Sequence, residues 1–143
     1  MKCEIIIDGS CEERVVIYAQ KRGPLTDEIQ RLAEGYCGEL FGYRDKEIAK
    51  LDPSEIYCVA VIGSRVYAVC ANEKWQLKQR LYLLSEVLPG YFVKINQSCI
   101  ANVNKIDRFD GSISGTLKVR FKNGYVDYVS RRQLKAVKER MGL

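Results

Sequence analysis

The sequence predicts a mostly β protein with a few covering α-helices, and three observations carry this prediction. Apolar and polar residues alternate over residues 92–95 and again between residues 119 and 129, which is the period of half-buried strands. Asn123-Gly124 lies between two such runs and is typical of a two-residue hairpin turn. Gly63-Ser64 divides the apolar stretch of residues 56–70 in the same way. We therefore expect small sheets of hairpin-connected strands.

Two helices are expected among these strands. Asn72 is a suitable N-cap for a helix over residues 73–88, in which leucines recur at helical spacing until Pro89-Gly90 stops it. Trp75 is interpreted as a packing residue on this helix rather than a stacking platform. Ser130 is interpreted as the cap of a final helix over residues 131–141. Each helix is expected to cover a sheet.

Residues 1–50 are interpreted as a separate small α/β leader, a β-β-α unit. Residues 4–8 and 15–20 are strand candidates, and a helix is expected from about Thr26, with an apolar stripe that extends to Leu40. Gly38 or Gly42 is expected to end that helix. A unit of this size cannot bury both faces alone, so the leader is expected to dock or to dimerise. The boundary is placed in the polar stretch before Pro53, and the second domain covers 54–143.

Charge is distributed unevenly between the two parts of the chain. Residues 1–56 hold 8 Lys or Arg against 12 Asp or Glu, a net charge of −4, whereas residues 57–143 hold 15 against 6, a net charge of +9. A basic domain of this kind is an electrostatic footprint for a polyanion, and the acidic part would be repelled from it. The plainer interpretation is a solvated basic surface.

Several classes of protein are disfavoured by composition. The chain has no histidine, and its six cysteines never occur as C-x-x-C, so neither a zinc site nor another cofactor is expected. Without histidine, a nucleophile motif or a phosphate loop, an enzyme is not expected either. No apolar run approaches a bilayer span and no signal peptide is evident, which predicts a cytoplasmic protein. Most of its cysteines are then expected to be reduced core thiols, with a redox-sensing pair as the alternative, and oxidation of Cys99 could matter because it lies beside the expected DNA loop.

The run Y-F-V-K-I-N-Q-S-C-I-A-N-V-N-K-I over residues 91–106, followed by strand, Asn-Gly turn, strand and V-S-R-R-Q-L-K, resembles the LytTR DNA-binding domain of bacterial transcription regulators. The resemblance extends back to about Ser54. It implies an elongated β fold that presents loops to successive major grooves of double-stranded DNA. No phosphoacceptor receiver domain is recognisable, so the chain is similar to short, stand-alone LytTR regulators with a leader of this size, and a phosphorylation switch is not carried over.

The resemblance also implies roles for particular residues. Asn96 and Gln97 are expected at base edges, the first hairpin is expected to bring its tip near the duplex, and one of two arginines at the start of the final helix is expected to be a base reader. Lysines are expected to contact phosphates. The complete set is Ser64, Arg65, Lys94, Asn96, Gln97, Lys122, Arg131 and Arg132. Asn102, by contrast, is expected to brace the sheet. A homodimer on repeated half-sites, and a small membrane protein as regulatory partner, are implied by the resemblance alone.

Two other functions stay open at this point. An RNA or single-strand binder should expose aromatic side chains between the basic strands, and Tyr125 and Tyr128 fall on opposite faces by parity. A protein-docking module would lose little when Gln97 or Arg131 is replaced.

Overall fold

The computed structural model describes residues 2–12, 14–34, 39–111 and 116–143. Three α-helices are present in these residues: α1 (Pro24–Glu34), α2 (Leu81–Val87) and α3 (Arg131–Met141). The strands are β1 (Leu40–Arg44), β2 (Glu47–Leu51), β3 (Cys58–Ile62), β4 (Arg65–Val69), β5 (Lys74–Leu77), β6 (Phe92–Asn96), β7 (Cys99–Asn102), β8 (Ile106–Gly111), β9 (Leu117–Phe121) and β10 (Val126–Val129). Short 3-10 turns at Pro53–Glu55 and Val103–Lys105 connect them. The mostly β fold class is confirmed.

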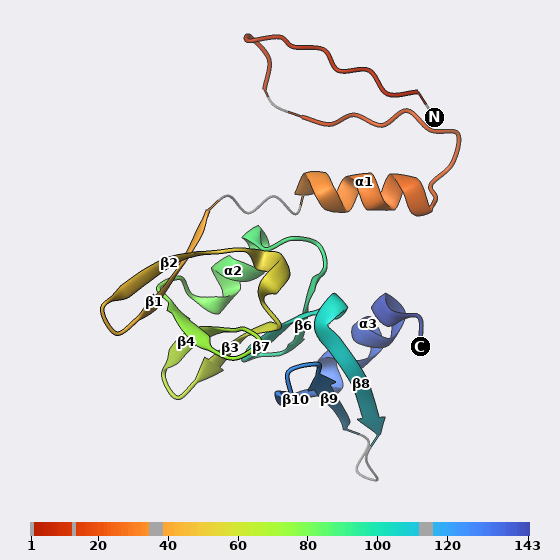
Figure 1. Ribbon diagram of the computed structural model, residues 1–143. Coiled ribbons are helices and arrows are strands. Elements are labelled where there is room, and N and C mark those ends of the chain that lie inside the picture. The colour runs from red at the N-terminus through yellow and green to blue at the C-terminus, as the bar shows by residue number, and fades with distance from the viewer. Residues whose placement is uncertain (1, 13, 35–38, 112–115) are drawn as a thin grey trace.

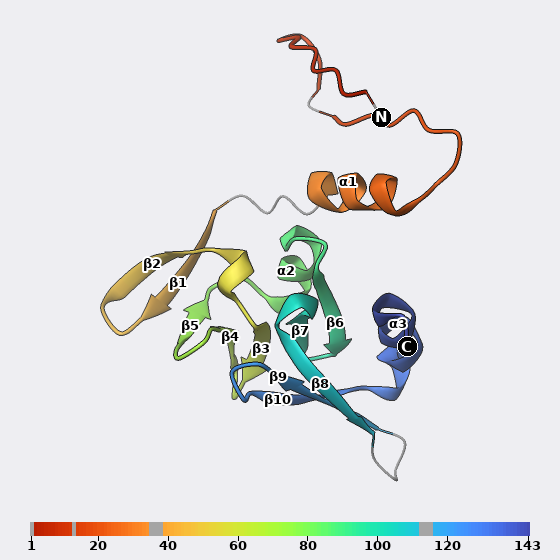
Figure 2. The same ribbon diagram turned by 45° about the vertical axis from the view of Figure 1, so that its right-hand side comes forward.

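The strands form two antiparallel sheets. The larger has seven strands in the order β2-β1-β5-β4-β3-β7-β6, and the smaller has three in the order β10-β9-β8. Helix α2 covers one face of the large sheet, and the small sheet and α3 cover part of the other (Figures 1 and 2). The large sheet is therefore the central layer and has an apolar core on each side.

Along the central strands, successive apolar side chains point to opposite faces of the sheet and so contribute to both cores. In β3, Cys58 and Ala60 face the small sheet, while Val59 between them faces α2. The α2-side core also holds Leu84 and Leu88, and the α3-side core holds Phe121 and Val137. Because neighbouring residues of a strand point to opposite faces, a strand in the middle layer is expected to be apolar on both faces, as β3 is throughout and β7 is as far as Ala101.

Both predicted hairpin turns are present. Gly63 and Gly124 have φ angles of 66° and 89°, in the left-handed region that glycine adopts without steric cost. The final helix also begins as expected, because the Ser130 hydroxyl accepts a hydrogen bond from the Gln133 amide. It ends at Gly142, which is left-handed.

The predicted helix over residues 73–88 is wrong in its first half. Residues 74–77 form β5, which pairs with β4 through Tyr67 and Gln76 among other residues, and only residues 81–87 are helical. Asn72 consequently caps no helix. Trp75 is buried, but on a strand, where it and Leu77 alternate with the polar side chains of Lys74 and Gln76. The alternation of apolar and polar residues over 74–77 is typical of a strand, and these residues form a strand although the leucines are spaced as in a helix.

The leader also differs from the prediction. Residues 4–8 and 15–20 are extended but belong to neither sheet, and α1 is the only element assigned in the described part of residues 1–38. Leu40, expected at the end of the helical stripe, instead begins β1. Residues 40–51, around the predicted boundary, form the β1–β2 hairpin, which joins the large sheet through β5. The described residues up to the end of α1 lie apart from the sheets in Figure 1, and the name leader is kept for this part below.

Gly42 has a role other than ending a helix. A Cβ atom at this position would lie 2.5 Å from the Trp75 Cβ and 2.8 Å from Leu51 Cδ1. The close approach of β1 to β5 therefore requires glycine here, and this contact is what allows the first hairpin to join the sheet.

Candidate nucleic-acid interface

Two turns lie side by side at one end of the large sheet. Strands β3 and β7 are antiparallel with Ala60 opposite Cys99, so the end of β3 lies next to the beginning of β7. The Val61 amide donates a hydrogen bond of 2.8 Å to the Ser98 carbonyl, which fixes the β6–β7 turn beside the β3–β4 turn. Ser64 and Arg65 are thereby brought to the same end of the sheet as Gln97.

The first turn of α3 reaches the same end. The Ser130 amide donates a hydrogen bond of 2.9 Å to the Ile95 carbonyl, one residue before the end of β6. Arg131 and Arg132 follow directly and are both exposed. Three segments that are distant in sequence thus converge at one end of the sheet.

Asn96 holds this arrangement together. Its Nδ2 donates to Asp127 Oδ1 at 2.9 Å and to the Tyr128 carbonyl at 2.7 Å, and its Oδ1 accepts from the Ser98 amide at 2.7 Å. The side chain therefore joins the β6–β7 turn to β10. Its amide, predicted to read bases, is already hydrogen-bonded within the protein.

Gln97 and Lys94 form a second part of the surface, on the α2 side. Both are exposed, and they line a small hollow of about 60 Å³ together with Tyr82 and Ser85 of α2. Gln97 makes no hydrogen bond with any residue that the structure describes. Its amide is therefore available to a ligand in a way that the amide of Asn96 is not.

Lys122 is separated from this cluster. It lies in the β9–β10 turn, where the neighbouring Asn123 donates a hydrogen bond of 2.9 Å to the Cys70 carbonyl at the far end of β4. Strand β10 runs from that turn toward α3, so Lys122 and Arg131 lie at opposite ends of β10. The structure brings seven of the eight predicted residues to one end and leaves Lys122 at the other.

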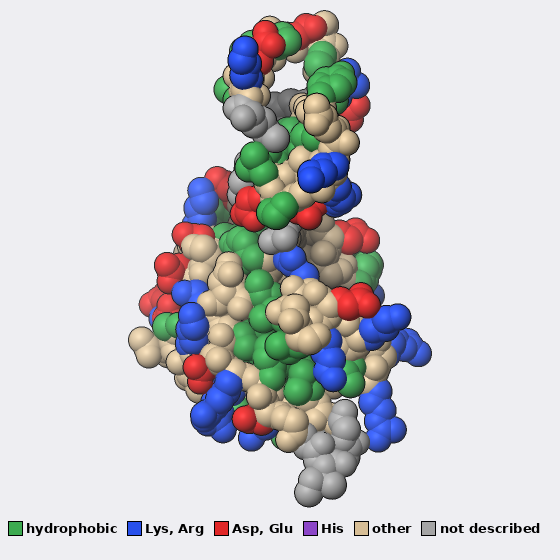
Figure 3. All heavy atoms as spheres, turned by 90° about the vertical axis from the view of Figure 1, so that its right-hand side faces the viewer, with side chains coloured by type: hydrophobic (Ala, Val, Ile, Leu, Met, Phe, Trp, Pro, Cys, Tyr) green, Lys and Arg blue, Asp and Glu red, His purple; other side chains and the backbone are tan. Residues whose placement is uncertain are grey.

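The cationic side chains at this end of the sheet are not neutralised by acidic side chains of the described residues. Across the described residues, Arg65, Lys94, Arg131 and Arg132 form no ion pair within the chain. On the face shown in Figure 3, Lys and Arg side chains flank a central hydrophobic band on both sides. Asp127 places an acidic side chain in contact with the cluster, where its carboxylate accepts the hydrogen bond from Asn96.

Two participants were not predicted from the sequence. Asp127 and Tyr128 sit at the end of β10, where the first orients Asn96 and the second supplies the carbonyl that Asn96 binds. Tyr128 is 52% exposed, whereas Tyr125 packs against Phe121, with ring centroids 6.0 Å apart, as their parity predicts. The alternation of buried and exposed residues along β10 could have predicted that Tyr128 is exposed. Nothing in the neighbouring sequence identifies Asp127 as a hydrogen-bond partner of Asn96.

The cysteine nearest the cluster is not reactive. Cys99 is fully buried, and a hydrogen bond between its protonated thiol and Cys58, together with burial, raises the pKa of that thiol well above the usual value. The thiolate is the nucleophilic form, so a raised pKa makes alkylation and oxidation slow. Cys58 is also buried, which fits the predicted core thiols, whereas Cys3 and Cys11 are exposed; Cys37 lies outside the described residues. No group of metal-ligating side chains is found in the part that the structure describes.

An antiparallel sheet that gathers amide and cationic side chains from two turns and a helix start has the side-chain types that nucleic-acid-binding domains use. The chain belongs to the LytTr DNA-binding domain family, which matches residues 46–142. The match begins within the β1–β2 hairpin, somewhat earlier than the resemblance in sequence.

Relatives and a solved structure agree with this assignment. The chain is 32% identical over 149 residues to proteins named uncharacterized HTH-type transcriptional regulators from Staphylococcus aureus strains NCTC 8325 and COL, with 100% of this chain and 99% of theirs covered. It is similar in fold to the LytTr DNA-binding domain of a protein described as a methyl-accepting/DNA response regulator from Bacillus cereus, with a TM-score of 0.69 and 18% identity over 73% of this chain and 97% of that one. Within the described residues, five strands separate α2 from α3, so these two helices do not form a helix-turn-helix.

The described residues contain no helix that is both long and apolar enough to cross a membrane.

Proposed function

We propose that this protein is a sequence-specific, double-stranded DNA-binding transcription regulator that reads major grooves with loops instead of a recognition helix. The observation that carries the proposal is the convergence of the β3–β4 turn, the β6–β7 turn and the start of α3 at one end of the sheet. Family membership supplies DNA as the ligand. The names of the Staphylococcus aureus relatives support a role in transcription.

Each residue has a separate role in this proposal. Gln97, whose amide is exposed, reads a base edge, and adenine is the base whose N6 and N7 atoms suit an amide. Arg131 or Arg132 reads a second base from the start of α3, and Ser64 and Arg65 approach the duplex from the neighbouring turn. Asn96 positions Gln97 and α3 relative to one another and need not leave its internal hydrogen bonds.

Lysines at two places would contact phosphates. Lys94 lies next to Gln97, and Lys122 lies at the opposite end of β10, so the two would meet the DNA backbone at separate points. Contacts of this kind set affinity and register without reading sequence. We further propose that two copies bind repeated half-sites, which would raise both affinity and the length of sequence read.

Exposed rings near the cluster, Tyr82 on α2 and Tyr128 on β10, keep the single-strand alternative open, whereas two half-buried rings of the large sheet do not support it. Tyr43 on β1 and Tyr67 on β4 lie on either side of β5 in the large sheet, but Lys78 Nζ is 4.2 Å from the centroid of the first ring and Lys74 Nζ is 5.1 Å from that of the second. A base could stack on these rings only after displacing the lysines. Docking of a protein at this end of the sheet is the remaining alternative, and it predicts no dependence on DNA sequence.

The test is selection of the full chain on a pool of randomised duplexes. The enriched sequence is then titrated against a scrambled duplex and against its single strand at two salt concentrations. Binding at least about a thousandfold tighter than to the scrambled duplex is expected for a specific regulator. Weak binding that disappears as salt rises, without enrichment, would overturn the proposal and leave a generic polyanion surface.

A further inference from the structure

The leader exposes large apolar side chains that neither sheet covers. Tyr18 is 93% exposed, Ile7 is 90% exposed and Ile5 is 81% exposed. Figure 3 shows hydrophobic side chains around the leader, away from the sheets. Isolated apolar side chains at a surface are ordinary, but several along two adjacent extended segments mark a surface that binds another chain.

The two extended segments carry opposite charges. Residues 2–12, the acidic arm, hold Glu4, Asp8 and Glu12 against one lysine, and residues 14–22, the basic arm, hold Arg14, Lys21 and Arg22 and no acidic residue. No backbone hydrogen bond joins the arms to each other among the residues described here, and the local turn at Asp8 uses its carboxylate for Ser10. Each arm thus offers a backbone edge and charges that complement those of the other.

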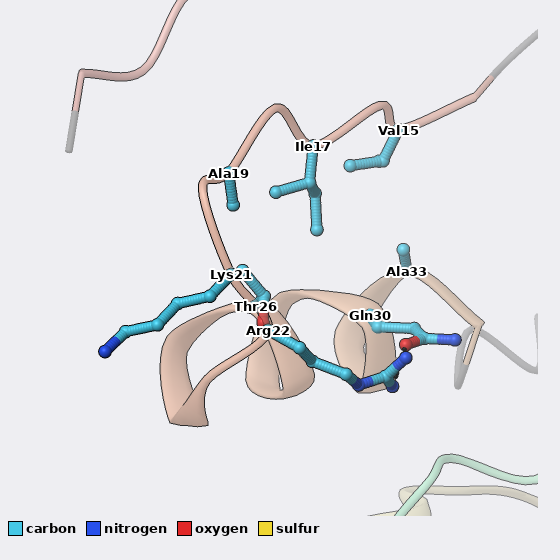
Figure 4. A pocket seen from close by; sticks show the side chains of 8 residues that line it. All are labelled: Val15, Ile17, Ala19, Lys21, Arg22, Thr26, Gln30 and Ala33. Carbon is cyan, nitrogen blue, oxygen red and sulfur yellow. Dashed lines mark hydrogen bonds between the residues drawn. The ribbon is translucent and has the colours of Figure 1, made fainter.

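The basic arm is held against α1 at one end and stands away from it at the other. The Thr26 hydroxyl accepts a hydrogen bond from the Gly23 amide and donates one to the Gly23 carbonyl, and Arg22 pairs with Asp27 at 2.7 Å. From this junction Val15, Ile17 and Ala19 point toward α1 across an open groove of about 590 Å³ (Figure 4). The groove is a preformed space beside an unpaired strand edge.

We propose that the leader is the dimerisation element, and that the acidic arm of each copy pairs as a β-strand with the basic arm of a second copy. In a strand added at that edge, Ile5 and Ile7 would extend the apolar face of Ile17 toward α1, because alternate residues of a strand share a face. The exchange is reciprocal, so it closes as a twofold dimer. The inference rests on the proposed function, since binding to repeated half-sites requires a second copy.

Charge reversal distinguishes exchange between copies from closure within one chain. A variant E4K/D8K makes the acidic arm positive, and a variant R14E/K21E makes the basic arm negative. Each variant alone would place like charges opposite one another in the dimer, which is expected to raise the dimer dissociation constant by roughly tenfold or more. Mixed in equal amounts, the two variants carry complementary arms at both contacts and should form a heterodimer.

The measurement is sedimentation equilibrium of the full chain without DNA, for the wild type, each variant and the mixture. Glu86→Lys on α2, where the side chain is exposed, is the control for reversing a charge outside the leader, and it should leave the dimer unchanged. Recovery of the dimer in the mixture supports the proposal. A monomeric wild type, variants that dimerise like the wild type, or a mixture that stays monomeric would overturn it.

The DNA selection is a separate readout. A protein that is monomeric by sedimentation yet enriches a specific duplex would refute the role of the leader while leaving the DNA-binding function intact. A dimer that enriches no duplex would refute the DNA-binding function while leaving the role of the leader in dimerisation intact.

Discussion

Replacing Gln97 by alanine should weaken specific DNA binding without affecting folding. The side chain is exposed and makes no hydrogen bond to the described residues, so its loss should change the free energy of unfolding by no more than about 0.5 kcal/mol. A good bidentate contact between an amide and adenine contributes about 1 to 3 kcal/mol of discrimination. The dissociation constant for the selected duplex should therefore rise roughly 5- to 150-fold, while binding to scrambled duplex stays as it was.

The assay is a fluorescence anisotropy titration of both duplexes at constant salt, with urea unfolding of each variant. Asn104→Ala is a matched control, because it removes an exposed amide side chain near the opposite end of β7. Lys122→Ala gives a contrast: it should weaken binding to both duplexes alike and reduce the salt slope by about one. If Gln97→Ala weakens both duplexes equally, or leaves both unchanged, the assignment of Gln97 as a base reader is wrong.

The other predictions concern stability and cysteine chemistry. Asn102 is 1% exposed, donates to the Ile56 carbonyl at 2.8 Å and accepts from the Asn104 amide at 3.0 Å, so Asn102→Ala should lower the free energy of unfolding in urea by about 2–4 kcal/mol; a loss below about 1 kcal/mol would contradict its bracing role. Ser130→Ala removes the cap of α3 and should cost about 1 kcal/mol, which Ser130→Asp should largely restore. Burial raises the pKa of Cys70 from 9.0 to about 11. The Cys70 thiol therefore loses its proton at a lower pH in the unfolded chain than in the folded protein, so its contribution to stability should fall as pH rises from about 9 to about 11. Peptide mass spectrometry after brief iodoacetamide treatment at pH 8 should show that the exposed Cys3 and Cys11 are labelled before Cys70.

Features fixed by local geometry were predictable from the sequence. The Asn123-Gly124 turn requires a residue with positive φ, and Gly124 supplies it. Ser130 begins α3 because its hydroxyl satisfies an otherwise unpaired backbone amide. Asn102 was expected to brace the sheet, and its two hydrogen bonds confirm this. The first two features depend on a few neighbouring residues, whereas Asn102 also bonds the Ile56 carbonyl on a segment distant in the sequence.

Features decided by packing at a distance were not predictable in the same way. Trp75 and Leu77 fit an amphipathic helix as well as a strand, and the pairing of Ala68 with Trp75 across β4 and β5 decides between them. Gly42 resembles the end of a helix until Trp75 approaches it. At the candidate site, sequence proximity grouped Asn96 with Gln97, but contacts with Asp127 and Tyr128, more than 30 residues away, give the two amides different environments.

The hydrogen bonds of Asn96 have a consequence for how specificity could change over evolution. They fix the separation between the β6–β7 turn and the start of α3 before any ligand is bound. If the protein binds DNA as proposed, the folded protein therefore determines how far apart the bases are that these two segments read. Gln97, Arg131 and Arg132, by contrast, point outward and can be exchanged without disturbing that frame. Related proteins could therefore acquire new target sequences by substitution at the exposed positions, while the length and phase of the target stay constant.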